Sequence, residues 1–252
     1  VRAQYYTDIT AADRQLEEVY ASVRRHLGSN TLFLYTSDNG AQWPFAKWNL
    51  YDAGIHLPFI AAWPDVIRPG SRTDAMISFC DLLPTFMDLA GGRAPENLDG
   101  RSFARVLRGK TGKHRDRIYA VHSGDGNMNV YPMRCVRTEK FKYILNLHPE
   151  FEYTTHIDKA GAKDGKYYWD SWERKAESNE AAAAIVRRYH QRPAEELYDV
   201  AEDPHELRNL AGEKSSRNTL ENLRKHVREW MKQQSDEGKV FGTPRLLRET
   251  SR

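Results

Sequence analysis

The chain has 252 residues, 40% of them hydrophobic and 11% aromatic, which is enough for one large or two modest folded domains. Its 38 lysines and arginines are offset by 35 aspartates and glutamates, and the resulting net charge of +3, without a long basic run, argues against nucleic-acid binding. No apolar stretch approaches the roughly 18 residues that a membrane span requires. The two cysteines do not make a disulfide framework, so the cysteine content leaves the cellular compartment open.

Alternating helices and strands are predicted over the first half of the chain. Apolar residues at helical spacing predict a helix over residues 8–27, with Thr7 or Asp8 at its start and Gly28 at its end. The short apolar run over residues 31–36 is typical of a strand covered on both faces of a parallel sheet. The further predicted elements are a strand over residues 58–63, a helix over residues 81–90 and a short helix over residues 102–107. This alternation indicates an α/β fold.

The second half of the chain has a different character, because its predicted elements no longer alternate, as is typical of an α+β subdomain. The predicted elements are short strands over residues 117–122, 133–138, 141–146 and 196–200 and an amphipathic helix over residues 219–234. A tight turn near Glu139 and Lys140 predicts that the two middle strands form an antiparallel hairpin. Residues 149–178 are rich in aromatic side chains and are interpreted as an irregular insertion. We place a domain boundary near residue 112, between an α/β part over residues 1–112 and an α+β part over residues 113–252.

Two adjacent oxygen-bearing side chains, Asp38 and Asn39, follow the strand over residues 31–36. In open α/β sheets, ligands gather beyond the carboxyl ends of the strands. A carboxylate beside a carboxamide suits a hard cation such as Ca²⁺ or Mg²⁺, and Lys47, nine residues after Asp38, can hold an anionic oxygen as a point charge. Taken alone, Asp-Asn-Gly is also ordinary turn chemistry, and Lys47 is also a surface lysine after a turn.

Four segments of the chain together resemble a known family. The first covers residues 37–60 and reads Ser-Asp-Asn-Gly-Ala-Gln-Trp-Pro-Phe-Ala-Lys-Trp-Asn-Leu-Tyr-Asp-Ala-Gly-Ile-His-Leu-Pro-Phe-Ile. The others are Tyr5-Tyr-Thr-Asp-Ile-Thr-Ala-Ala-Asp13, Tyr131-Pro-Met-Arg-Cys-Val-Arg137 and Glu196-Leu-Tyr-Asp-Val-Ala-Glu-Asp-Pro-His-Glu206-Leu-Arg-Asn-Leu-Ala211. In the order in which they occur along the chain, these segments resemble the type I sulfatases of the alkaline phosphatase superfamily, and the spacing of the first one is most similar to the N-sulfoglucosamine sulfohydrolase (sulfamidase) branch.

The resemblance implies a fold and an activity. The expected fold is α/β, with part of a sulfatase-like mixed sheet and its flanking helices, followed by a smaller α+β subdomain with an antiparallel sheet and a C-terminal helix. The implied reaction is hydrolysis of sulfate esters or sulfamates on a sulfated sugar of the heparan type. Asp38 and Asn39 are then ligands of Ca²⁺, or of Mg²⁺, and Lys47 binds the sulfate. A periplasmic, secreted or lysosomal location is implied by the resemblance alone.

Three further residues are candidates for contacts with the substrate. His56 stands where many sulfatases place an arginine or another polar residue, and a structural histidine is the alternative. His122 lies just past a predicted strand, and Arg134 lies in the segment Tyr-Pro-Met-Arg. For His122 and Arg134 the alternatives are packing within the subdomain and a satisfied ion pair.

The nucleophile of the family is not found in this sequence. Sulfatases carry a Cys-x-Pro/Ala-x-Arg motif whose cysteine becomes formylglycine, and neither Cys80, in Phe-Cys-Asp-Leu-Leu-Pro, nor Cys135, in Arg-Cys-Val-Arg-Thr, fits it. The family's N-terminal aspartate pair and its upstream lysine and histidines are also not found. The chain is therefore expected to be the C-terminal part of a sulfatase, to need the N-terminal part of the same catalytic domain, which carries the formylglycine, and to be inactive alone.

Two alternative functions stay open at this point. One is a non-catalytic, sulfatase-like binding or structural protein. The other is a phosphatase or phosphodiesterase of the same superfamily, although such relatives usually use more metal ligands, including histidines, and no Asp-x-x-x-His pattern stands near Asp38. The choice between N-sulfate and O-sulfate substrates is also open.

Overall fold

The structure is a computed structural model that describes residues 2–126, 128–159 and 166–247. Its contacts divide the chain into two compact units, one of Val1–Ser37 and Pro58–Asp116, and one of Asp38–Leu57 and Arg117–Arg252. The segment that contains Asp38 and Lys47 therefore packs with the C-terminal half of the chain. The domain boundary near residue 112 stays a prediction. None of the described helices is long and apolar enough to span a membrane.

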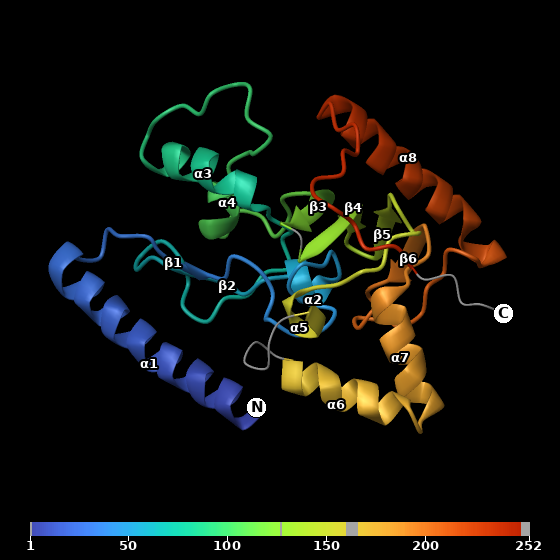
Figure 1. Cartoon of the computed structure of the whole chain (residues 1–252). Helices are drawn as coiled ribbons and strands as arrows, with labels where there is room; N and C mark the ends of the chain where they lie inside the picture. Colours follow the sequence, from blue (N-terminus) through green and yellow to red (C-terminus); the bar gives the residue numbers. More distant parts are fainter. Residues whose placement is uncertain (1, 127, 160–165, 248–252) are drawn as a thin grey trace. The chain divides into compact units, whose positions relative to one another are not determined.

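The first unit contains helices and one short pair of strands (Figure 1). Its elements are α1 (Arg2–Leu27), β1 (Phe33–Thr36), β2 (Phe59–Ala62), a 3₁₀ turn (Phe79–Asp81), α3 (Leu82–Leu89) and α4 (Ala104–Leu107). Helix α1 begins earlier than predicted, because the Thr7 hydroxyl does not cap it but donates to the Ala3 carbonyl one turn back.

The pairing of β1 differs from the prediction of a parallel sheet. β1 pairs with β2 in the antiparallel sense, with Phe33 opposite Ala62 and Thr36 opposite Phe59. The reason lies in the intervening segment, which brings the chain back to the end of β1, where the Thr36 hydroxyl donates to the Pro58 carbonyl at 2.8 Å. Strands joined in this way run in opposite directions.

The second unit is built on a four-stranded antiparallel sheet in the order β3-β4-β5-β6. The strands are β3 (Arg117–Asp125), β4 (Asn129–Thr138), β5 (Phe141–Asn146) and β6 (Glu195–Asp199). β4 and β5 pair as the predicted hairpin, with Cys135 opposite Ile144, which confirms that prediction.

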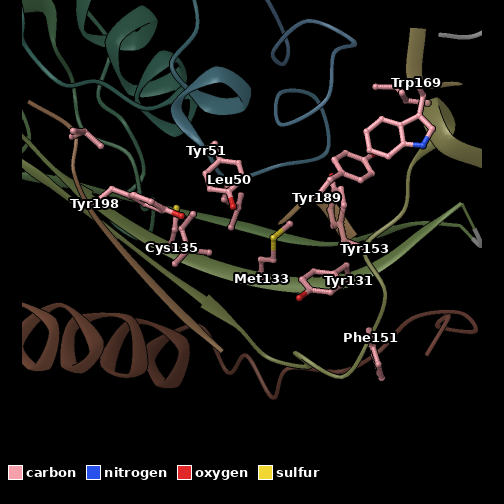
Figure 2. Close-up of a cluster of buried hydrophobic side chains, with 13 residues drawn as sticks. Leu50, Tyr51, Tyr131, Met133, Cys135, Phe151, Tyr153, Trp169, Tyr189 and Tyr198 are labelled. Carbon is pink, nitrogen blue, oxygen red and sulfur yellow. The ribbon is translucent and has the colours of Figure 1, made fainter. Parts of the chain in front are cut away.

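Each face of this sheet is covered by its own hydrophobic cluster, because successive residues of a strand point to opposite faces. Helix α8 (Arg217–Gln233) lies along one face, where Leu220, Leu223 and Val227 pack on the sheet (Figure 1). The other face packs against the loop before β2. Figure 2 shows Leu50 and Tyr51 of that loop over the sheet, in one cluster with Met133 and Cys135 of β4.

The residues predicted to be an irregular insertion contain helices instead. These are α5 (His156–Lys159) and α6 (Tyr167–Ala176); the second unit also contains α2 (Asp52–Ile55) and, just after the segment, α7 (Glu180–His190). Helix α7 was not predicted, although Asn179 caps it by accepting from the Ala182 N–H and its four successive alanines favour a helix. Of the aromatic residues that suggested irregular structure, Tyr153 and Trp169 are fully buried in a core that also contains Tyr189 of α7, whereas Tyr167 is exposed. Residues 160–165 of the predicted insertion lie outside the described residues.

Candidate functional site

The loop of residues 38–57, called the Asp-Asn-Gly loop below, folds tightly against itself. The Gly40 N–H donates to the Gly54 carbonyl at 3.0 Å. A Cβ atom on Gly40 would lie 2.0 Å from the Ala53 carbonyl oxygen, and one on Gly54 would lie 2.5 Å from the Ala46 carbonyl oxygen. Both positions therefore require glycine because of close backbone approach, and a simple turn preference does not account for them.

Two bulky residues of this loop, Phe45 and Trp48, adopt left-handed backbone angles, with φ of 64° and 63°. This region is disfavoured for residues with a Cβ atom, at a cost of about 1–3 kcal/mol for each residue. Such strain persists only where the surroundings determine the conformation from several directions. The predicted sulfate-binding Lys47 directly precedes Trp48.

Asn49, which is buried with Tyr153 and Arg192, helps to fix this strained backbone conformation. The Asn49 amide donates to the Tyr153 hydroxyl at 2.8 Å and accepts from the Arg192 guanidinium at 2.6 Å. The Tyr153 hydroxyl donates in turn to the Trp48 carbonyl at 3.0 Å. The Arg192 guanidinium lies 3.6 Å from the centre of the Tyr153 ring. These contacts link the strained part of the loop to the aromatic core shown in Figure 2.

A second anchor is the buried carboxylate of Glu196 on β6. It accepts hydrogen bonds from the hydroxyls of Tyr51, at 2.6 Å, and Tyr198, at 2.5 Å, and from the Asn146 amide at 2.8 Å. Burial, and then the neighbouring Glu196 charge, raise the pKa of the Tyr51 hydroxyl, so it remains a donor at neutral pH. The buried charge is thus satisfied by donors from the loop and from the sheet.

A third anchor is an ionic cluster in which the fully buried Lys142 of β5 contacts Asp52 and, at 2.9 Å, Glu206. Arg137 also pairs with Asp52, at 3.1 Å, and the Asp52 N–H donates to Glu206 at 2.6 Å. Burial opposes ionisation of Asp52, but Lys142 and Arg137 hold the pKa of its carboxyl below the ordinary value. Burial raises the pKa of Glu206 above its ordinary value, although Lys142 acts in the other direction. The cluster fixes the end of the loop to the sheet.

Most of these anchoring residues lie in the segments whose sequences resemble the sulfatase family. Glu196 and Glu206 both lie in the family-like segment of residues 196–211, and the structure shows that both hold the Asp-Asn-Gly loop. Lys142 and Arg192 were missed. The available signal for Lys142 was a lysine between Phe141 and Tyr143 in an apolar strand, because a buried lysine must find a carboxylate partner.

The two predicted metal ligands, Asp38 and Asn39, lie at the start of the loop. The Asp38 side chain is exposed, and among the described residues it has no hydrogen-bond or ion-pair partner, whereas Asn39 is half-buried and has a partner. An exposed, unneutralised carboxylate beside a carboxamide has donor oxygens of the kind that a hard cation takes, of which Ca²⁺ takes roughly six to eight. Metal binding by Asp38 and Asn39 stays a prediction. Residues 2–126, 128–159 and 166–247 contain no cluster of three or more His, Cys, Asp or Glu side chains that could hold a metal.

The predicted sulfate-binding residue, Lys47, is half-buried. Its ammonium lies 4.7 Å from the centre of the Trp48 ring. Within the described part of the chain it has no ion-pair partner. The ammonium is therefore available to bind an anion.

The three candidates for substrate contacts have different surroundings. The His56 side chain is 75% exposed and lies 3.8 Å from Asp52. His122 on β3 is 2.7 Å from the Asn129 side-chain oxygen, and burial lowers its pKa, so the ring is neutral at pH 7. Arg134 is buried, pairs with Asp236, and donates to the His122 carbonyl at 3.1 Å. The structure thus joins His122 to Arg134, and the Arg134–Asp236 pair matches the alternative of a satisfied ion pair.

The comparisons with known proteins agree on one family. A family model described as "N-sulphoglucosamine sulphohydrolase, C-terminal" matches residues 40–164. An ulvan-active sulfatase of Formosa agariphila is 36% identical over 93% of this chain and 44% of that protein. The human N-sulphoglucosamine sulphohydrolase is 28% identical over 90% of this chain and 47% of that protein.

Solved structures agree in fold. One, determined in complex with its substrate D-glucosamine-2-N,6-O-disulfate, superposes with a TM-score of 0.64 at 22% identity and covers 91% of this chain and 40% of that one. A 2-O GAG sulfatase superposes with a TM-score of 0.61 at 24% identity, over 86% of this chain and 40% of that one. The architecture is therefore the alkaline-phosphatase-like fold of sulfatases, as predicted.

The chain belongs to the sulfatase family and is a C-terminal portion of it, which confirms the predicted family. It spans 44% of the bacterial relative and 47% of the human one, so less than half of either protein.

Proposed function

We propose that this chain supplies the metal- and sulfate-binding loop of a sulfatase that hydrolyses sulfate esters or sulfamates of sulfated sugars. The observation that carries the proposal is the contrast within the Asp-Asn-Gly loop. Its Asn49, Tyr51 and Asp52 are fixed by buried hydrogen bonds and ion pairs. The Asp38 carboxylate and the Lys47 ammonium, in contrast, have no ion-pair partner within the described residues. A rigid loop with two uncompensated charges of opposite sign suits a cation and an anionic group.

Each residue then has a distinct task. Asp38 supplies an anionic oxygen and Asn39 a carbonyl oxygen to Ca²⁺, or to Mg²⁺, which when bound polarises the sulfuryl group. Lys47 holds a sulfuryl oxygen by its ammonium. The nucleophile, expected to be a formylglycine, lies outside this sequence, since neither cysteine stands in the required motif.

The proposed substrate class is a sulfated sugar. It is supported by the human relative, whose name specifies N-sulphoglucosamine, and by the solved relative with bound D-glucosamine-2-N,6-O-disulfate. His56, His122 and Arg134 remain predicted contacts to this sugar.

The proposal is tested by assaying the whole protein for release of inorganic sulfate from D-glucosamine-2-N,6-O-disulfate, with a phosphate monoester in parallel. We expect sulfate release that is lost with a metal chelator and restored by Ca²⁺. Hydrolysis of the phosphate ester alone would favour a phosphatase, and the absence of turnover on both would favour a non-catalytic protein.

The chain by itself is expected to show no sulfatase turnover, because catalysis depends on positioning the complete set of groups and the nucleophile is not among them. The measurement is sulfate release from an aryl sulfate by the purified 252-residue chain in the presence of Ca²⁺. Turnover above background, depending on the metal and on Lys47, would contradict the expectation.

Replacing Lys47 by alanine in the whole protein is expected to lower kcat/KM by about 10- to 100-fold, since a charge-assisted contact contributes about 1.5–3 kcal/mol. KM should rise and kcat should fall together, because the contact exists in both the bound substrate and the transition state. Lys47→Arg should retain part of the activity because it keeps the charge. The exposed Lys110→Ala serves as the matched control and should behave as wild type. Unchanged kinetics of Lys47→Ala would make Lys47 an ordinary surface lysine.

A further inference from the structure

Trp48 is held in place by two contacts of its indole and one of its backbone. The indole N–H donates to the Asp125 carboxylate at 2.9 Å. Its ring stacks on the His156 ring, with centres 4.8 Å apart and planes 7° from parallel. Its carbonyl accepts from the Tyr153 hydroxyl at 3.0 Å. Together these contacts sustain the left-handed backbone of Trp48, at φ of 63°.

The Lys47 ammonium lies over the face of this indole, 4.7 Å from the ring centre. A cation over an aromatic face is attracted by the negative charge of the π system. Donation of the indole N–H to the Asp125 carboxylate makes the ring richer in electrons, which strengthens that attraction. A lysine has a flexible four-carbon stem, so an aromatic face that attracts its ammonium restricts the positions it samples.

We propose that Trp48 is a positioning residue for the sulfatase reaction: its fixed indole holds the Lys47 ammonium in place before the sulfuryl group arrives. This inference rests on the proposed sulfate-binding role of Lys47. Its physical basis is preorganisation, because a cation that is already placed loses less freedom when the anion binds. The strain at Trp48 is then the consequence of placing an aromatic face directly beside the lysine that it orients.

The test is a double-mutant cycle of Trp48→Leu and Lys47→Ala in the whole protein, with kcat/KM for D-glucosamine-2-N,6-O-disulfate as readout. Trp48→Leu is expected to lower kcat/KM by about 3- to 30-fold, the factor that corresponds to loss of a cation–π contact. In the Lys47→Ala background the same change is expected to have less than about a twofold effect, because the group that Trp48 orients is gone. Leucine has a Cβ atom like tryptophan, so the backbone strain is the same in the variant.

Two further variants separate positioning from folding. Trp48→Phe keeps an aromatic face and loses the N–H donor, so it should recover most of the activity that Trp48→Leu loses. Trp43→Leu removes another indole from the same loop, one that lies against Tyr168 with ring centres 5.0 Å apart, and is expected to leave kcat/KM within about a factor of two to three. In NMR spectra, the methylene protons next to the Lys47 ammonium should move downfield in Trp48→Leu as the ring current is lost.

The outcomes are distinguishable. Lys47→Ala with wild-type kinetics refutes the sulfate-binding role and the positioning inference with it. If Lys47→Ala is impaired, the inference alone is overturned when Trp48→Leu matches wild type, when it costs the same factor in both backgrounds, or when the Lys47 resonances do not move. If Trp48→Leu fails to fold, the wild-type protein decides the matter: the methylene protons next to the Lys47 ammonium should be shifted upfield of those of the exposed Lys110 by the indole ring current, and equal shifts overturn the inference.

Discussion

Replacing Asp38 by alanine is expected to abolish sulfatase activity in the whole protein while leaving the fold intact. The change removes the anionic oxygen proposed for the metal, and the metal's stabilisation of the developing charge is worth several kcal/mol, so kcat/KM should fall by roughly a thousand-fold or more. The fold should survive because Asp38 is exposed and has no hydrogen-bond or ion-pair partner in the described part of the chain. Sulfate release as a function of Ca²⁺ concentration, together with thermal unfolding, measures both effects.

Two companion variants sharpen this experiment. Asp38→Asn keeps one oxygen and the side-chain shape but loses the charge, so it should need more Ca²⁺ and recover part of the activity. Asp74→Ala, at another exposed aspartate, is the matched control and should change neither activity nor unfolding. Near-wild-type activity of Asp38→Ala at low Ca²⁺ would show that Asp38 is not a ligand.

Replacing Lys142 by methionine is expected to destabilise the second unit by about 3–5 kcal/mol at neutral pH, because it leaves buried carboxylates without their shared cation. Lys142 is completely buried and faces both Asp52 and Glu206. Methionine has a similar length, so little volume is lost and the effect is largely electrostatic. The measurement is the free energy of unfolding from urea titration.

The effect of Lys142→Met should depend on pH in a defined direction. The pKa of Glu206 is raised, so its carboxyl binds a proton more tightly in the folded chain than in the unfolded chain. The stability that this proton binding contributes is lost as the pH rises through the raised pKa. Without Lys142 this pKa rises further, so the deficit of the variant should be largest at about pH 8 and smaller at about pH 5. The stability contributed by Asp52 changes with pH in the opposite direction, because the pKa of its carboxyl is held below the ordinary 3.8. That stability is therefore lost only when the pH falls below this range.

The neighbouring lysine of the same hairpin provides the control. Lys140 is 59% exposed and pairs with Asp199 at 3.4 Å, so Lys140→Met should cost no more than about 1 kcal/mol, without the same pH dependence. Equal effects of the two substitutions would contradict a special role for the buried cluster.

The sequence could propose a candidate site because the residues concerned are close neighbours in the chain. An apolar strand followed by Asp38 and Asn39, with Lys47 close behind, is visible as a pattern of neighbouring residues. The distant residues that anchor this loop could not be predicted from such a local pattern. Lys142, Arg192 and Glu206 lie far from the loop along the chain, and no periodicity indicates which distant charge neutralises which buried one.

By itself, the sequence indicated the family through the resemblance of four of its segments to the sulfatases. It also determined the hairpin of β4 and β5 and the amphipathic helices α1 and α8, because apolar spacing and turn chemistry act over a few residues. Only the tertiary structure decided that β1 and β2 pair antiparallel, that the aromatic segment folds into helices, and that the Asp-Asn-Gly loop packs with the C-terminal half of the chain. Those outcomes depend on burial and on compensation of charge between distant segments. A buried lysine or glutamate is tolerated only where the fold brings its partner to it.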